Sequence, residues 1–136
     1  MRIMGLDVGD VKIGVAISDE LGWTAQGITI IYRNGKIPAW QHLGDLIDEY
    51  KVEEVVVGLP KNMDGTIGEQ AHKAMIFAET VRETFRLPVA MWDERLSTVA
   101  AAKTLLEADV RRSKHKDLLD KMAAVIILQG YLNSLR

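Results

Sequence analysis

The amino-terminal stretch MRIMGLDVGDVKIGVAISD constrains the fold more than any other part of the sequence. Two mainly apolar runs, Arg2–Asp7 and Lys12–Ser18, predict buried strands, and the turn residues Gly9 and Asp10 join them. Alternate positions of the second run hold small residues, so another layer can approach that face closely. Asp7 stands at the inner end of a buried strand, where an unpaired charge is very costly. It therefore needs either a structural partner or a function.

The rest of the chain alternates between helical and strand patterns. Further strands are predicted at Ala25–Tyr32, Glu54–Gly58 and Pro88–Trp92, and helices at Pro38–Lys51, from a capping box at Thr66–Glu69 onward, at Thr98–Glu107 and at Asp117–Leu135. The second helix is expected to bury a stripe that includes Ala71, Met75 and Phe85. This order predicts an α/β fold with a five-stranded mixed sheet, in which a three-stranded antiparallel meander precedes two parallel strands and helices cover both faces. Ligands of such sheets bind beyond the carboxyl ends of the parallel strands.

Composition narrows the class of protein. A chain of 136 residues with 48% hydrophobic and 26% charged residues is expected to form one globular domain, residues 1–136. The net charge of −2 excludes a protein coated in positive charge, and the lack of cysteine excludes disulfides and thiolate metal sites. The sequence shows no signal peptide and no membrane-spanning stretch, so a cytoplasmic location is expected.

Acidic residues stand where strands end or helices begin. Asp7 ends the first strand, Asp93 and Glu94 follow the fifth, and Asp117 and Asp120 share a face of the last helix. Converging carboxylates repel one another, and a hard divalent cation such as Mg²⁺ relieves the repulsion. Each acid also has a structural alternative: the turn amides, an ion pair with the next arginine, or a helix amino terminus. The residues alone leave both interpretations open.

Four motifs, in order, resemble those of the YqgF (RuvX) family. They are Asp7-Val8-Gly9 with Lys12 and Gly14-Val15-Ala16, Gly58-Leu59-Pro60 with Asn62 and Asp64-Gly65-Thr66, Asp93-Glu94-Arg95-Leu96-Ser97-Thr98, and Asp120 with Ala123-Ala124 and Ile126-Ile127-Leu128. The first motif also resembles a hairpin of actin-like ATPases, but the four together span essentially the whole chain. The resemblance implies a ribonuclease-H-like fold related to Holliday junction resolvases. It implies activity as a resolvase or as the nuclease that matures the 5′ end of pre-16S rRNA.

The resemblance also selects among the acids. It implies that Asp7, Glu94 and Asp120 are the catalytic, metal-binding set, and Asp120 matches the family motif better than Asp117 does. The better-known resolvases of this fold carry an acid at the end of the fourth strand, where this chain has Pro60-Lys61-Asn62. Glu94 is expected to supply the missing carboxylate.

Phosphodiester hydrolysis suggests how these residues would act. Two Mg²⁺ (or Mn²⁺) ions about 3.5–4 Å apart can activate water and stabilise the leaving oxygen, with Asp7 as the bridging ligand. Lys12, Asn62, Arg95 and Thr98 are candidates for contacts with the substrate, and so is the basic stretch that holds Arg111, Arg112, Lys114 and Lys116. Their structural alternatives are charge balance, capping and a solvated loop.

Three functions follow, in order of preference. The first is a metal-dependent endonuclease for structured RNA or branched DNA, with ribosomal precursor particles as partners and a monomer or homodimer as the assembly. The second is a non-catalytic nucleic-acid-binding module in ribosome assembly or transcription. The third is a small actin-like ATPase, which is disfavoured because such proteins need two related halves around the nucleotide.

Overall fold

One five-stranded sheet organises the protein. The computed structural model describes residues 1–96 and 116–136, with side chains in the second range from residue 121 onward. The strands are β1 (Arg2–Val8), β2 (Lys12–Ser18), β3 (Ala25–Tyr32), β4 (Val52–Leu59) and β5 (Val89–Asp93). The other described elements are α1 (Ala39–Tyr50), α2 (Glu69–Phe85), the 3₁₀ turn η1 (Glu94–Leu96) and α4 (Lys116–Ser134).

The sheet has the predicted mixed topology. Its strand order is β3-β2-β1-β4-β5, so the first strand is central. β1 pairs antiparallel with β2, and β2 pairs antiparallel with β3. β4 lies parallel to β1 on its other side, and β5 lies parallel to β4. The carboxyl ends of β1, β4 and β5 therefore meet at one edge, where the acids after the first and fifth strands were expected to converge.

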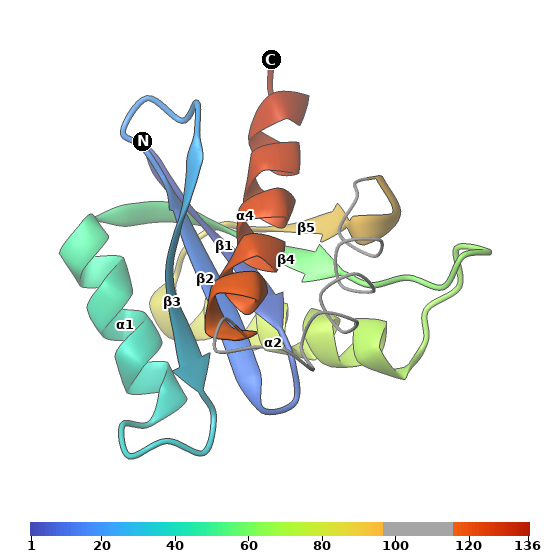
Figure 1. The fold of residues 1–136 in the computed structure, drawn as a ribbon, viewed down its shortest axis with the longest axis horizontal. Helices are drawn as coiled ribbons and strands as arrows, with labels where there is room; N and C mark the ends of the chain where they lie inside the picture. Colours follow the sequence, from blue (N-terminus) through green and yellow to red (C-terminus); the bar gives the residue numbers. More distant parts are fainter. Residues whose placement is uncertain (97–115) are drawn as a thin grey trace.

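The pleat of the sheet divides the core into two layers. On one face, Met4 and Leu6 of β1 pack with residues of α1 and α2. On the other face, Ile3 packs with residues of α4 such as Ile127 and Leu128. Figure 1 shows α4 crossing one face of the sheet, and the core contacts place α1 and α2 on the other face. The prediction of helices on both faces is confirmed.

Helix α4 approaches the sheet closely because glycines lie beneath it. A Cβ atom added to Gly5 would lie 2.6 Å from the Cβ of Leu128, and one added to Gly58 would lie 2.5 Å from Cδ1 of Ile127. Ala16 of β2 packs in the same layer, as the small residues of that strand predicted. A bulkier residue at Gly5 would push the helix off the centre of the sheet.

Polar contacts also tie α4 to two other strands. The side chain of Gln129 accepts a hydrogen bond from the amide of Ala25 and donates one to the carbonyl of Trp23, both at 3.0 Å. The hydroxyl of Tyr131 donates to Glu54 of β4. Burial, together with this bond, raises the pKa of Tyr131 to about 12. The helix is therefore fixed in its position along the sheet as well as in its distance from it.

Two local predictions are wrong, and one lies outside the described residues. Helix α2 begins at Glu69 after Gly68, which makes no side-chain cap, so the capping box does not form. Thr66 instead donates its hydroxyl to Asp64 at 2.6 Å. Met75 is 44% exposed and does not belong to the buried stripe of α2. The helix predicted at Thr98–Glu107 falls among residues that the structure does not describe.

In the described ranges, each helix falls short of the length and apolar character that crossing a bilayer requires.

Substituting Gly5 tests how closely the helix packs. We expect Gly5→Ala to lower the free energy of unfolding by roughly 1–3 kcal/mol, because the new methyl group would overlap the Cβ of Leu128. Gly27→Ala is the matched control, since it also lies on a strand that faces α4 but its nearest contact is Lys121 at 3.2 Å. Urea unfolding of both variants measures the difference. An equal or larger cost at Gly27 would contradict the packing described here.

Candidate active site

Asp7 lies on the face of β1 that α4 covers. Side chains alternate along a strand, so Asp7 shares the face of Ile3 and Gly5. It is half-buried and lies opposite Gly14 of β2. The amide of Gly9 in the following turn donates to the carbonyl of Lys12 at 2.8 Å. That turn amide is therefore satisfied by the backbone, which removes part of the structural explanation for Asp7.

Glu94 occupies the same face, two strands away. It begins η1 directly after β5, and only 5% of the residue is exposed. Its Oε2 would lie 3.1 Å from a Cβ atom added to Gly58 on β4. Leu6 pairs with Val57, so Asp7 and Gly58 come next along these neighbouring strands. Asp7 and Glu94 therefore lie on the same face on either side of β4, and Ile127 of α4 fills the position where a side chain on Gly58 would stand.

Asp120 lies in α4, within the part of the helix whose side chains are not described. It precedes Ala124 by one helical turn. The carbonyl oxygen of Ala124 would lie 3.3 Å from a Cβ atom on Gly5. Later residues of the helix pack with Ile3, toward the start of β1. The backbone of α4 thus carries residue 120 toward the end of β1 that holds Asp7.

Asp93 has a different environment from its neighbour Glu94. Its carboxylate accepts hydrogen bonds from the backbone amide of Arg95 at 3.0 Å and from Nη2 of the same residue at 2.8 Å. Lys61 lies 4.0 Å away, and the Asp93 side chain is 16% exposed. Hydrogen bonds from Arg95 lower the pKa of Asp93, with a smaller contribution from Lys61. The predicted alternative of an acid–arginine ion pair therefore holds for Asp93.

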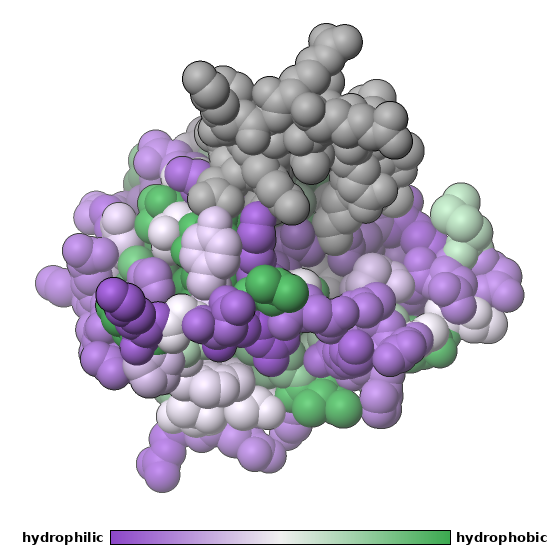
Figure 2. Space-filling model, turned by 60° about the horizontal axis from the view of Figure 1, so that its bottom comes forward, coloured by the Kyte–Doolittle hydropathy of each residue, from purple (hydrophilic) through white to green (hydrophobic). Residues whose placement is uncertain are grey.

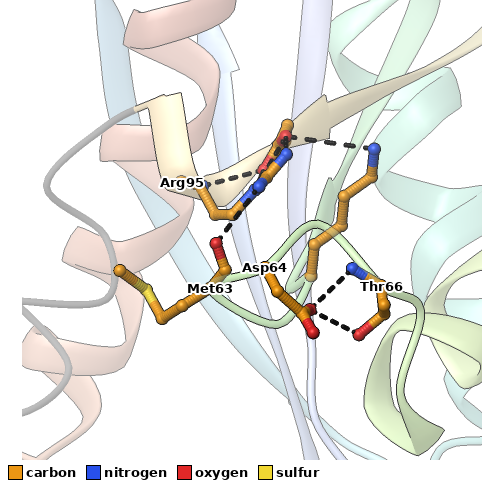
Figure 3. A network of polar contacts seen from close by, with 6 residues as sticks. Met63, Asp64, Thr66 and Arg95 are labelled. Carbon is orange, nitrogen blue, oxygen red and sulfur yellow. Dashed lines mark hydrogen bonds and ion pairs between the residues drawn. The ribbon is translucent and has the colours of Figure 1, made fainter.

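Arg95 also contacts the loop that follows β4. Its Nη1 donates to the carbonyl of Met63 at 3.5 Å, and Gly65 packs against the guanidinium. Figure 3 shows Arg95 reaching toward Met63, with Asp64 and Thr66 below it. We call the contacts among Asp93, Arg95 and Met63 the bracket. The bracket holds the residues on both sides of Glu94, so it fixes where that carboxylate lies.

The remaining substrate-binding candidates differ in what the structure shows of them. Lys12 begins β2 with its ammonium 5.5 Å from the centre of the Tyr32 ring. Asn62 donates to Oγ1 of Thr66 at 2.9 Å and so closes the loop after β4, in agreement with its structural alternative. Five candidates, Thr98, Arg111, Arg112, Lys114 and Lys116, have side chains outside the described part of the chain.

Sequence reasoning did not find two features of the site. One is the close approach of Ile127 and Glu94 to Gly58, although Gly58-Leu59-Pro60 stands out as a motif in the sequence. The other is the bracket, for which the adjacency of Asp93 and Arg95 was the available signal. Among the side chains that the structure describes, no three His, Cys, Asp or Glu residues are grouped closely enough to hold a metal. The side chain of Asp120 is not among those that the structure describes.

Comparison with known proteins identifies the family. A family model described as "RuvX: Holliday junction resolvase" matches residues 1–134. The chain belongs to the RuvX family. A protein from Desulforamulus reducens, named "Putative pre-16S rRNA nuclease", is 58% identical over 134 residues and 98% of each chain is covered. The RuvX assignment confirms the family expected from the four motifs, and with it the nuclease class of enzyme.

Solved structures confirm the ribonuclease-H-like fold of this RuvX protein. The fowlpox virus Holliday junction resolvase is 16% identical with a TM-score of 0.58, and all of both chains is covered. Thermus thermophilus RuvC in complex with Holliday junction substrate is 17% identical with a TM-score of 0.51. That match covers 99% of this chain and 95% of the RuvC chain.

The ion pair of Asp93 predicts how stability depends on pH. The pKa of Asp93 in the folded protein is below the ordinary value of 3.8. Its ionised form therefore stabilises the fold above that pH, and the contribution disappears as the pH falls through the folded-state pKa. We expect Asp93→Asn to cost about 1 kcal/mol near neutral pH and progressively less in acid.

Urea unfolding from neutral to acidic pH measures this dependence. Arg95→Met should flatten the acid limb of the stability curve as Asp93→Asn does, because it removes the other partner. An acid limb as steep in both variants as in the natural protein would show that the bracket does not stabilise the fold.

Proposed function

We propose that this RuvX protein is a metal-dependent endonuclease in which Asp7, Glu94 and Asp120 hold the metal. The observation that carries the proposal is the position of Glu94, almost fully buried against Gly58 on the same face of the sheet as Asp7. Burying a carboxylate is costly, so a buried glutamate on the face that holds another acid supports a function for the pair. The path of α4 toward the same edge supports Asp120 as the third member.

The donor atoms of the proposed site suit a hard divalent cation. Carboxylate oxygens are the ligands that Mg²⁺ and Mn²⁺ prefer, and the bare backbone of Gly58 lets the carboxylate of Glu94 approach β4 on the face that holds Asp7. Two such ions, when bound, lower the pKa of an attacking water and stabilise the leaving oxygen of a phosphodiester. The chain's own contribution is to fix the carboxylates, which the bracket does for Glu94 and the β1–β2 turn does for Asp7.

Lys12 is the best-placed residue for a contact with the substrate phosphate. It begins the strand that pairs with β1, and alternation places it on the face of Gly14, opposite Asp7. We assign Asn62 and Arg95 a supporting role in this proposal, since both already shape the loop after β4. Thr98 and the basic residues Arg111, Arg112, Lys114 and Lys116 remain predicted contacts with the nucleic-acid backbone.

Structured RNA is the preferred substrate, and 5′-end processing of pre-16S rRNA the preferred reaction. The name of the Desulforamulus relative supports this choice, whereas the resolvase structures support branched DNA as the second substrate. The proposal includes a single domain over residues 1–136, a cytoplasmic location, ribosomal precursor particles as partners and a monomer or homodimer. A binding module without cleavage is the second candidate, because residues 60–62 supply no acid after β4.

Substituting the three acids tests the proposed activity. With Mg²⁺ or Mn²⁺, the natural protein should cleave a pre-16S rRNA fragment faster than a four-way DNA junction. Asp7→Asn, Glu94→Gln and Asp120→Asn should each lower the rate by more than about a hundredfold, because even outer-shell partners of metal ligands cost 10–100-fold. Gel assays with both substrates side by side measure the rates.

The exposed Asp45 of α1 provides the control, since Asp45→Asn removes one negative charge away from the proposed site and should leave cleavage unchanged. Binding of both nucleic acids without metal-dependent cleavage would favour the binding module. Cleavage that survives Asp7→Asn would rule out the proposed metal site.

A further inference from the structure

A second cavity opens at the same edge of the sheet, on the opposite face from Asp7 and Glu94. Its volume is about 440 Å³, within the usual range for ligand pockets. The residues that matter for its chemistry are Asp10, Arg33, Trp40, Lys73, Ile76 and Phe77. They come from the β1–β2 turn, the segment after β3, and helices α1 and α2. Figure 2 brings this end of the molecule forward and shows a largely hydrophilic surface with small, separate hydrophobic patches.

Two cations and one acid form the polar rim of the cavity. Nζ of Lys73 lies 3.2 Å from a carboxylate oxygen of Asp10, and Gln70 donates to the other oxygen at 3.3 Å. These bonds, that of Lys73 first, lower the pKa of Asp10, so it remains ionised at neutral pH. Lys73 also pairs with Glu69 at 3.5 Å, so two acids balance its charge and Arg33 is the cation of the rim that can meet a phosphate.

Arg33 has hydrogen-bonding capacity to spare. Its Nη1 donates to the carbonyl of Gly9 at 3.0 Å, which uses one of five guanidinium donors. Among the residues that the structure describes, the other guanidinium donors make no hydrogen bond. A guanidinium held by one contact and otherwise open to the cavity suits an incoming phosphate, which it can bind through two parallel bonds.

An aromatic wall lies beneath this arginine. Trp40 and Phe77 stack with their ring centres 4.9 Å apart and their planes 20° apart. The guanidinium carbon of Arg33 lies 5.5 Å from the centre of the Phe77 ring. Aromatic rings next to an arginine are the features that single-strand nucleic-acid sites use, with stacking for the base and charge for the backbone.

We propose that this cavity binds one nucleotide of a single-stranded RNA segment next to the cleavage position. Arg33 would hold its phosphate, and the base would lie against Trp40 and the exposed Ile76, with the buried Phe77 stacked on Trp40. The proposal rests on the nucleic-acid substrate proposed above. Asp10 follows Asp7 by three residues, so their Cα atoms lie within roughly 11 Å.

The experiment measures binding without cleavage. Asp7→Asn protein labelled with ¹⁵N is titrated in EDTA with an oligouridylate of about eight nucleotides, within the 4–16 that such sites cover. The chain has 3 tryptophans, and the indole signal of Trp40 is assigned with Trp40→Phe. We expect the Trp40 signal to shift on binding. An unchanged Trp40 signal at saturation would overturn the proposal.

Charge variants in the same background separate a specific contact from general attraction. Arg33→Ala should weaken binding about tenfold and lower the slope of log affinity against log salt by about 0.7, the value for one lost phosphate contact on a single strand. Arg82→Ala is the matched control, because it removes one exposed positive charge from α2, outside the cavity. Equal effects of the two variants would overturn the proposal.

A charge-retaining variant guards against a folding defect, since Arg33 also contacts Gly9. Arg33→Lys should keep most of the salt dependence, and its failure to do so in a folded protein would count against the phosphate contact. The readouts do not depend on activity. If the Trp40 signal shifts but the natural protein does not cleave RNA in the presence of metal, the cavity proposal is supported and only the nuclease proposal is contradicted.

Discussion

The close seating of α4 on the middle of the sheet is the constraint on which the rest of the structure depends. It requires bare backbone at Gly5 and Gly58, where Leu128 and Ile127 of the helix occupy the space a side chain would fill. The same absence of a side chain at Gly58 leaves the space that the carboxylate of Glu94 approaches. One packing requirement thus sets the distance of the helix from the sheet and lets the carboxylate of Glu94 approach the backbone of β4.

Asp93 and Glu94 are adjacent acids at the end of β5, and the backbone directs their side chains into different surroundings. Asp93 ends the strand and pairs with Arg95 and Lys61, whereas Glu94 begins η1 and turns to the face that α4 covers. The pair that Asp93 forms is partly screened by solvent and contributes modestly to stability. Its larger effect is geometric, because it anchors the chain on both sides of Glu94 and links that segment to the loop after β4.

The runs of apolar residues were enough to predict the sheet, because burial on both faces leaves near-continuous apolar stretches in β1, β2 and β4. They could not predict the start of α2. Thr66 could either cap the helix or bond to Asp64, and the sequence does not show that the bond to Asp64 forms. The choice of Glu94 over Asp93 came from family resemblance. No spacing rule places one carboxylate above a glycine two strands away and the other in an ion pair.

The β1–β2 turn connects the proposed catalytic face to the cavity on the other face. Arg33 holds the carbonyl of Gly9 from one side, and Lys73 holds the carboxylate of Asp10 from α2. A nucleic acid that reached both proposed places would have to bend sharply around this turn. Duplex DNA, with a persistence length of about 50 nm, resists such a bend, whereas a single strand does not. If both proposals hold, the strand would therefore be unpaired beside the cleavage position.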